Sequence, residues 1–379
     1  MQSQGLKDFY DDVARMKPGE IDGPEVWWVE RQEALEQAGY ILRPRYRPDW
    51  KPSWAGTKKH YRKFEDGQGL RLRLCMDATR ISDGKPVMLK RLLFQEGPYE
   101  LQINRRFSSE PLSSNPRNHC APLLDVIELP NDPPIMVHLL LRPFYNPQFQ
   151  TFGEFVTFFA QVCEGIQFMH ENHVAHRDCT SENIMLDPSN MYPESFHPIK
   201  IDRSKDFSGK AKKFTRTWRP TRYLLIDFGL SRQYDPANGP ALDEPLRGGD
   251  KSAPEHQNGE TPCDPFPTDV YYLGNLVRED YIQVSWFHCS EEICKYDGFE
   301  FMKPLIADMV QQDPKKRPTM DEVVASFAEV RSKLSAWKLR SRMARNNEIW
   351  PVAAWKGVGH WYRTIGYILS RKAAIPEPK

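Results

Sequence analysis

The stretch HRDCTSEN, residues 176–183, decides the fold expected for this chain of 379 residues. It places Asp178 and Asn183 five positions apart. This spacing is typical of sites in which an aspartate accepts a proton and an amide oxygen binds a metal ion during phosphoryl transfer. Two further motifs follow in order, Asp-Phe-Gly at 227–229 and Ala-Pro-Glu at 253–255. The ordered set carries more weight than any single short motif.

In these motifs the chain resembles the eukaryotic protein kinase superfamily, with insertions similar to those of divergent fungal, basidiomycete-type kinases. The resemblance covers residues 60–335. Lys90, at the end of Val-Met-Leu-Lys, resembles the lysine of the third strand, and Glu100 resembles its ion-pair partner on helix C. Thr268-Asp269-Val270-Tyr271 resembles the start of helix F, and Arg317 resembles the arginine that pairs with the glutamate of Ala-Pro-Glu, here Glu255.

The resemblance implies an α+β, bilobal protein-kinase fold. A small lobe would hold an antiparallel β-sheet and helix C, and a larger lobe would be mainly helical. The domains expected are an N-terminal extension packed on the catalytic domain (1–59), the small lobe (60–143), the large lobe (144–335, with a basic insertion at about 188–221) and a C-terminal basic and aromatic extension (336–379).

Local patterns predict several elements. The alternation at 70–74 has the two-residue period of a half-buried strand, and the turn signal Ser-Asp-Gly-Lys at 82–85 predicts a hairpin. Thr151 with Glu154 forms a potential capping box before a helical pattern of aromatic residues. Thr319 with Glu322 repeats that signal and predicts a long helix ending near residue 345.

Composition narrows the class of protein. The net charge of +1, from 52 basic and 51 acidic residues, argues against a general attachment to nucleic acid or membrane. Seven scattered cysteines fit reduced thiols in an intracellular protein, cytoplasmic or nuclear, and no apolar run is long enough to predict a transmembrane segment. His288, Cys289 and Cys294 lack a second close pair for a tetrahedral metal site, so ordinary packing is favoured.

Two segments leave alternatives open. Residues 200–222 carry nine basic residues against two aspartates, which suits either a solvated loop or a docking site for an acidic partner; the solvated loop is favoured because few aromatic residues are present. The tail from Trp350 alternates aromatic, apolar and basic residues. It suits a helix docked on the large lobe or a peripheral membrane contact, and docking is favoured because three glycines weaken an isolated helix.

Each matched residue has a role that the resemblance implies. Asp178 would accept the proton of a protein hydroxyl, and Asn183 and Asp227 would hold Mg²⁺ ions that bridge the phosphates of ATP. Lys90, fixed by Glu100, would bind the α and β phosphates. The expected nucleotide-binding residues are Lys90, Glu100, Gly67, Gly69, Met88 and Leu141.

Activation is expected to involve Arg177, which would receive a negative charge on the activation segment. The hydroxyls available for phosphorylation there are Ser231, Tyr234 and Ser252. Asp243 or Glu244 offers a permanent charge instead. The sequence therefore supports the hypothesis that activation does not require phosphorylation of this segment.

Departures from the family pattern concern catalysis. In the nucleotide pocket, Leu72 stands where the family has a third glycine, and Met88 stands where it has a small residue against adenine. Thr180 and Gly248 stand where the family has a lysine and a threonine that contact each other. Asn104 occupies a position of helix C that is usually apolar. The predicted activity is an ATP- and Mg²⁺-dependent protein kinase, of the serine/threonine branch because Glu182 precedes Asn183. The alternatives are a pseudokinase scaffold that binds partners and, less favoured, a small-molecule kinase, which would lack the Ala-Pro-Glu segment.

Overall fold

The computed structural model describes residues 19–93, 97–245, 249–257, 261–283 and 296–378. The predictions made for Gly248, His288, Cys289 and Cys294 lie outside these ranges. The chain divides into two compact units. The first combines residues 1–93, 123–140 and 192–212, and the second combines 94–122, 141–191 and 213–379.

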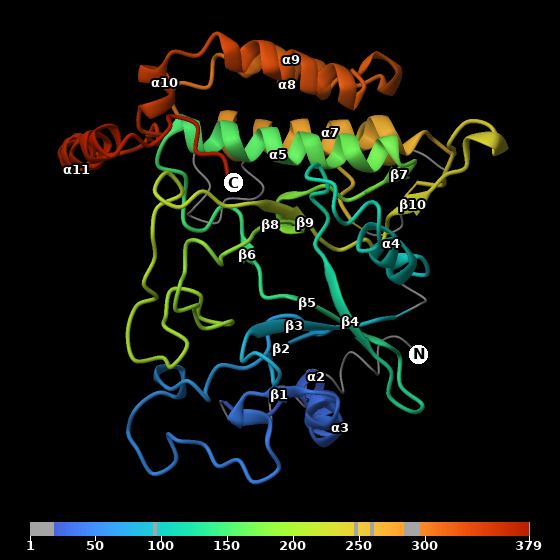
Figure 1. Cartoon of the computed structure of the whole chain (residues 1–379), viewed down its shortest axis with the longest axis vertical. Coiled ribbons are helices and arrows are strands. Elements are labelled where there is room, and N and C mark those ends of the chain that lie inside the picture. Colours follow the sequence, from blue (N-terminus) through green and yellow to red (C-terminus); the bar gives the residue numbers. More distant parts are fainter. Residues whose placement is uncertain (1–18, 94–96, 246–248, 258–260, 284–295, 379) are drawn as a thin grey trace. The chain divides into compact units, whose positions relative to one another are not determined.

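The first unit is built on a five-stranded antiparallel sheet with the order β1-β2-β3-β5-β4 (Figure 1). The strands are β1 (Tyr40–Leu42), β2 (Cys75–Arg80), β3 (Pro86–Arg91), β4 (Leu123–Ile127) and β5 (Ile135–Leu139). The predicted hairpin is confirmed, because Arg80 pairs with Asp83 in the turn that joins β2 to β3. The predicted strand at 70–74 is wrong: these residues are irregular, and the Leu70 N–H is bonded to the Glu25 carboxylate at 3.1 Å instead of to a neighbouring strand.

The sheet begins inside the segment expected to be an extension, since β1 pairs with β2. Two short helices, α2 (Gly23–Val29) and α3 (Gln32–Gln37), precede it. Trp28 and Leu35 from these helices are buried in one apolar core with Leu89 of β3 and Val137 of β5. The first unit therefore depends on residues before position 59 for an edge strand and for much of its core.

The favoured solvated loop describes most of residues 200–222, where eight of the nine basic residues are exposed and Arg216 is buried. Internal contacts are made earlier in the insertion and at Arg216. Phe196 and His197 are buried, and the His197 Nε2 atom lies 3.1 Å from the Glu65 carboxylate within the first unit. In the second unit Arg216 is buried, donates to the Phe144 carbonyl at 2.5 Å and stacks over Phe149. Arg216 is thus the exception within an exposed basic stretch, and a docking site for an acidic partner stays a prediction.

The second unit is mainly helical. Its helices are α4 (Glu100–Phe107), α5 (Phe152–Glu171), α6 (Pro254–Gln257), α7 (Pro265–Val277), α8 (Lys303–Met309), α9 (Met320–Ser332), α10 (Ala336–Arg340) and α11 (Trp350–Leu369). α5 packs against α9, and α7 packs against α8 (Figure 1). Its small sheets are β6 (Arg142–Pro143) with β8 (Ile184–Leu186) and β9 (Tyr223–Leu225), and β7 (Val174–Ala175) with β10 (Arg232–Gln233).

The predicted helix starts are confirmed with one difference. Thr319 and Glu322 form a complete capping box at α9. Thr151 caps α5, but the Glu154 carboxylate bonds to Gln150 and Thr217 instead of returning to the cap. The predicted long helix to residue 345 is wrong, because the chain breaks after α9 and Ser335 caps the separate helix α10.

The α+β protein-kinase fold is confirmed, with an antiparallel five-stranded sheet in one unit and a mainly helical second unit. Among the helices in the described part of the chain, none has the length and hydropathy that spanning a bilayer requires.

Candidate active site

The loop between β7 and β8 brings the two polar residues of the opening motif together. The Asn183 Nδ2 atom donates to the Asp178 carboxylate at 2.8 Å and to the Asp178 carbonyl at 2.9 Å. Asn183 is buried and Asp178 is partly exposed. The amide therefore fixes the orientation of a carboxylate that solvent can still reach.

A buried carboxylate at the start of α7 anchors this loop. Asp269 is 0% exposed and accepts hydrogen bonds from the backbone N–H of His176 at 2.7 Å and of Arg177 at 2.6 Å. The His170 ring lies 2.9 Å from the same carboxylate. A carboxylate that accepts several hydrogen bonds can remain buried. Arg177, whose N–H is one of the donors, has a φ of 68°, which is rare for a residue with a side chain.

The loop also meets the Asp-Phe-Gly segment. The Ile226 N–H donates to the Asn183 carbonyl at 3.0 Å, and the His176 ring lies 3.1 Å from the Ile226 carbonyl. Asp227 follows with an exposed side chain and a φ of 61°. Backbone conformations of this kind cost free energy and persist where the surrounding structure imposes them. These contacts place Asn183 and Asp227 in adjacent parts of one framework.

Helix α4 packs on the same segment through aromatic side chains. Phe228 is buried, with ring centroids 5.6 Å from His176 and 6.5 Å from Phe107 of α4. Asn104 is buried as well, and its Nδ2 atom donates to the Glu100 carbonyl at 2.9 Å. Asn104 therefore lies at an interior position of α4. Phe107 provides the apolar contact to Phe228.

Glu100 begins α4 and lies close to the end of the Asp-Phe-Gly segment. A Cβ atom added to Gly97 would lie 3.0 Å from the Gly229 Cα and 3.3 Å from the Glu100 carboxylate. The two glycines therefore allow a close approach of backbones beside this carboxylate. The pairing of Glu100 with Lys90 stays a prediction.

The activation segment passes close to Asp178. A Cβ atom added to Gly249 would lie 2.8 Å from the Leu230 side chain and 3.4 Å from the Asp178 carboxylate. Burial raises the pKa of Asp178; the His176 charge and hydrogen bonds from the Asp250 backbone and Asn183 oppose this without cancelling it. A carboxylate with a raised pKa is a stronger proton acceptor than an ordinary surface aspartate. The sequence did not single out Gly249 or Asp250.

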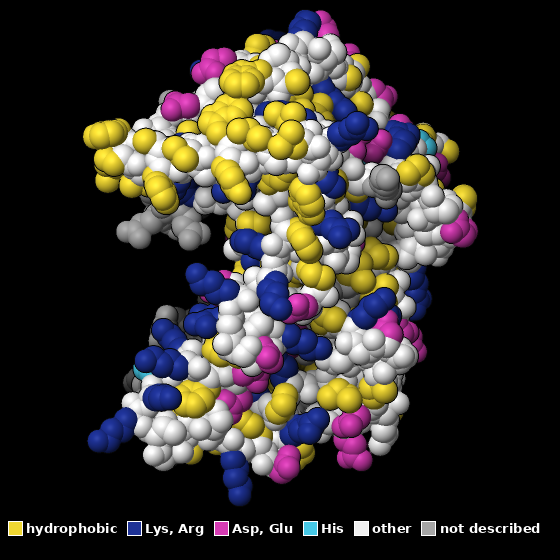
Figure 2. All heavy atoms as spheres, turned by 60° about the vertical axis from the view of Figure 1, so that its left-hand side comes forward, with side chains coloured by type: hydrophobic (Ala, Val, Ile, Leu, Met, Phe, Trp, Pro, Cys, Tyr) yellow, Lys and Arg dark blue, Asp and Glu magenta, His cyan; other side chains and the backbone are white. Residues whose placement is uncertain are grey.

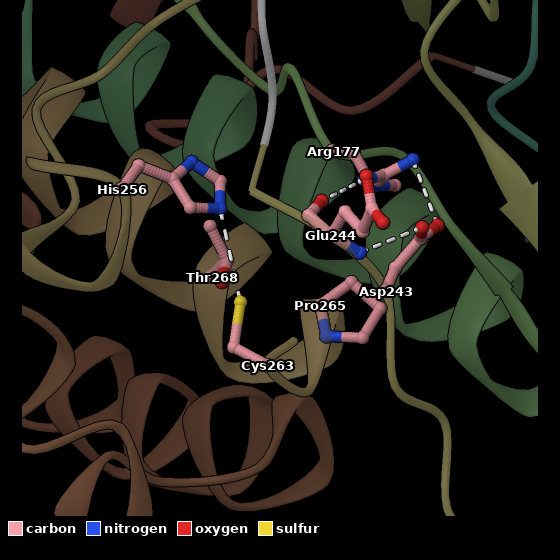
Figure 3. A pocket seen from close by; sticks show the side chains of 7 residues that line it. All are labelled: Arg177, Asp243, Glu244, His256, Cys263, Pro265 and Thr268. Carbon is pink, nitrogen blue, oxygen red and sulfur yellow. Dashed lines mark hydrogen bonds and ion pairs between the residues drawn. The ribbon is translucent and has the colours of Figure 1, made fainter. Parts of the chain in front are cut away.

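Arg177 is already paired with a carboxylate of the activation segment (Figure 3). Its guanidinium lies 2.9 Å from the Asp243 carboxylate and donates to the Glu244 carbonyl at 3.0 Å and the Leu230 carbonyl at 3.2 Å. The Tyr234 hydroxyl donates to Asp243 at 2.9 Å. Arg177 therefore binds the side chain of Asp243 and the backbone carbonyl of Glu244.

The other candidate hydroxyls are also engaged. Ser231 is fully buried and donates to the His176 carbonyl at 2.9 Å, and Ser252 donates to the Asp250 carboxylate at 2.9 Å. Adding a phosphate to Ser231 or Tyr234 would break these contacts, because each hydroxyl is a donor within a packed segment.

The segment ends at a buried ion pair between Glu255 and Arg317. Two guanidinium nitrogens lie 2.7 Å from the two carboxylate oxygens, and Arg317 also donates to the Gln311 and Pro267 carbonyls. Burial raises the pKa of Glu255, but hydrogen bonds from Arg317 and Thr268 outweigh it and hold that pKa below the ordinary value. The expected partners of the Ala-Pro-Glu motif are thus in contact.

In the first unit, Met88 and Lys90 lie on one face of β3, since alternate residues of a strand point the same way. Asp77 is paired with Met88 across the strands and so shares this face. Asp77 is buried and forms an ion pair with Arg43 at 2.8 Å, and Arg43 also pairs with Glu65. This charged cluster was not expected from the sequence.

A groove of about 1010 Å³ runs beside the cluster within the first unit. It is lined by residues between 41 and 47, by residues of β2 and β3, and by residues between 194 and 212 of the insertion. The insertion therefore contributes to a hollow on the sheet face that carries Met88 and Lys90.

The two glycines expected to bind phosphate are packed in the N-terminal segment. A Cβ atom on Gly67 would lie 2.1 Å from the Tyr61 carbonyl oxygen, and one on Gly69 would lie 2.9 Å from the Glu25 carboxylate. Gly67 is buried. Both glycines lie in the connection between the paired strands β1 and β2, and their role in phosphate binding stays a prediction. Leu141 follows β5 and is partly exposed.

The donor atoms of Asn183 and Asp227 fit a hard divalent cation, which prefers oxygen ligands. Within the ranges that the structure describes, no cluster of three or more His, Cys, Asp or Glu residues is placed to hold a metal ion.

Comparisons with known proteins agree on one family. The model of the protein kinase domain matches residues 144–327. Similar proteins are the mouse dual specificity protein kinase CLK4 (26% identical over 41% of this chain), the Dictyostelium discoideum dual specificity protein kinase zakA (30% over 32%) and the mimivirus putative serine/threonine-protein kinase R436 (24% over 43%). The matched segments cover 29%, 12% and 52% of those proteins, so the chain corresponds to a part of each.

Proposed function

We propose that this chain, which is similar to the protein kinase domain over residues 144–327, belongs to the eukaryotic protein kinase-like superfamily and transfers the γ-phosphate of ATP to protein hydroxyl groups. The observation that carries the proposal is the framework of the second unit, in which Asp269, Asn183 and the Asp-Phe-Gly segment hold Asp178 in a fixed, solvent-accessible position. Phosphoryl transfer requires mainly this kind of positioning together with neutralisation of charge.

The chain's own residues divide the work as follows. Asp178 accepts the hydroxyl proton and orients the oxygen for attack, and its raised pKa suits that task. Asn183 and Asp227 bind the divalent cation, which we propose to be Mg²⁺; a bound cation would neutralise phosphate charge. Lys90 binds the α and β phosphates. The acceptor is proposed to be serine or threonine, because Glu182 precedes Asn183 as in that branch of the resemblance.

The test is transfer of radiolabelled phosphate from ATP, with Mg²⁺ or Mn²⁺, to the protein itself or to a generic basic protein. We expect label from the natural chain and a loss of at least about a hundredfold in Asp227→Ala, because that variant removes one of two protein ligands of the cation. Absent transfer together with an absent thermal shift on nucleotide addition would overturn the proposal. A thermal shift without transfer would favour a nucleotide-binding scaffold.

We further propose that the kinase is active without phosphorylation of its activation segment. Asp243 supplies the charge that Arg177 would otherwise receive from a phosphate, and Ser231 and Tyr234 already serve as internal donors. Phosphatase treatment is therefore expected to leave activity unchanged.

Replacing Asp243 with asparagine is expected to lower kcat roughly tenfold, because a hydrogen bond to a charged group contributes about 1.5–3 kcal/mol and holds Arg177 in place. Glu244→Gln is the matched control: it removes the same charge from the next residue, whose side chain does not contact Arg177. Equal activity of the two variants would show that Arg177 does not need this carboxylate.

A further inference from the structure

The C-terminal helix α11 is docked to its unit through one buried face. His360, Thr364 and Tyr367 are buried on that face. The His360 ring lies 2.9 Å from the Arg340 carbonyl, and the Tyr367 hydroxyl lies 2.8 Å from the Thr215 hydroxyl. The docking that the sequence favoured is therefore present. These polar contacts fix which side of the helix faces outward.

The outward side is apolar. Trp355 is 80% exposed, Tyr362 82% and Leu369 79%, and Val358 and Ile365 lie between them. Their spacing of three and four residues gathers them into one stripe along the helix, opposite the docked face. Figure 2 shows hydrophobic side chains crowded over this part of the molecule. We call these five residues the outer stripe.

A second helix extends the apolar area. Trp337 of α10 is 68% exposed and stacks on Trp361 of α11, with ring centroids 4.6 Å apart. Apolar area gathered in this way on a protein surface marks an interaction site.

Basic residues predominate around the outer stripe, and Glu348, just before the helix, pairs with one of them, Lys356, at 3.0 Å. From Ile349 to Pro376 the sequence contains no aspartate or glutamate, and its charged residues are Lys356, Arg363, Arg371 and Lys372. Arg363 and Arg371 are exposed. A helix with an apolar face, aromatic residues and basic flanks is complementary to the surface of an anionic bilayer, where Trp and Tyr sit at the level of the headgroups.

We propose that α11 lies on the surface of a membrane that contains anionic phospholipids, with the outer stripe inserted between headgroups. A partner helix fits less well. Trp355 and Tyr362 are too large for the regular holes of a coiled coil, and Gly359 and Gly366 beside the stripe provide no side chain to form those holes. Insertion along the interface is also the mode open to a helix that cannot span a bilayer.

The test is co-sedimentation of the full chain with vesicles of phosphatidylcholine, with and without phosphatidylserine. We expect binding to the mixed vesicles, weak binding to phosphatidylcholine alone, and weaker binding at higher salt. The variant Trp355→Ser/Tyr362→Ser/Leu369→Ser should lose at least about tenfold in affinity. Arg363→Gln/Arg371→Gln should lose about fivefold for each charge removed.

The matched control is Leu72→Ser/Ile81→Ser/Leu242→Ser, which replaces three exposed apolar side chains elsewhere and should leave binding unchanged. All substituted residues are exposed, so thermal unfolding should report that each variant is folded. Three results would overturn the proposal: no binding to mixed vesicles, equal binding to neutral vesicles, or a dimer of the natural chain in sedimentation equilibrium that the stripe variant abolishes. The last would assign the stripe to self-association.

Discussion

Asp178→Asn is expected to lower kcat about a thousandfold while the protein stays folded. The physical reason is that an amide cannot accept the hydroxyl proton, and loss of a positioned general base costs about 10²–10⁴ in rate. The asparagine can still accept one of the hydrogen bonds that Asn183 and the Asp250 backbone donate, so the loop should keep its conformation. Initial rates of phosphate transfer and the thermal unfolding midpoint, measured on the same preparation, check both halves of this prediction.

Glu182→Gln is the control for this variant, because it removes one negative charge from the same loop at an exposed side chain. Its rate should stay within about twofold of the natural chain, as expected for a surface substitution. If Asp178→Asn retained a tenth of the activity or more, another group would have to accept the proton.

Arg317→Met is expected to reduce the free energy of unfolding by about 3–5 kcal/mol, because it leaves the buried Glu255 carboxylate without its partner. The side chains are 0% and 8% exposed, so water cannot replace the lost contacts. Chemical denaturation measures the change. Arg331→Met is the matched control: the same substitution removes a surface pair with Glu377 and should cost less than about 1 kcal/mol.

The pH dependence of the loss of stability in Arg317→Met tests whether the broken ion pair with Glu255 causes that loss. The pKa of Glu255 is lowered in the folded protein, so the pair stabilises the fold at pH values above the ordinary 4.5 and loses this effect as the pH falls through the lowered value. The stability difference between Arg317→Met and the natural chain should therefore shrink below pH 4.5. A difference that does not change with acid would assign the loss to packing around the arginine.

The second unit could be anticipated in detail from the sequence. Its motifs are short and local, and each one contains the residues that contact one another or the neighbouring loop, as Asp178 and Asn183 do. The Glu255–Arg317 pair was also foreseen from the resemblance. Capping signals gave the starts of α5 and α9 because a cap depends on residues only three positions apart.

The first unit was harder to predict because its contacts are distant in sequence. The alternation at 70–74 has the period of a strand, but Glu25 captures the Leu70 N–H and the strand starts later. The close packing of Gly67 on the Tyr61 backbone and of Gly69 on the Glu25 side chain could not be read from the glycines' own sequence neighbourhood. The ion pair between Asp77 and Arg43 joins residues 34 positions apart, and no short sequence pattern predicts it.

The insertion was predicted in part. Eight of the nine basic residues at 200–222 are exposed, as the pattern indicated, but Arg216 and the aromatic residues Tyr192 and Phe196 near the start of the insertion are buried. An arginine that donates to carbonyls inside a protein is indistinguishable in sequence from one in water.

The position of β1 in the sequence decides where a folded fragment of this protein can begin. A fragment that starts at residue 60, where the recognisable motifs begin, would lack the edge strand Tyr40–Leu42 and the aromatic and aliphatic side chains that cover the adjoining sheet. It would expose both a free strand edge and an uncovered apolar surface, the two features that promote aggregation. The smallest stably folded catalytic fragment must therefore begin well upstream of the region in which the family pattern can be read.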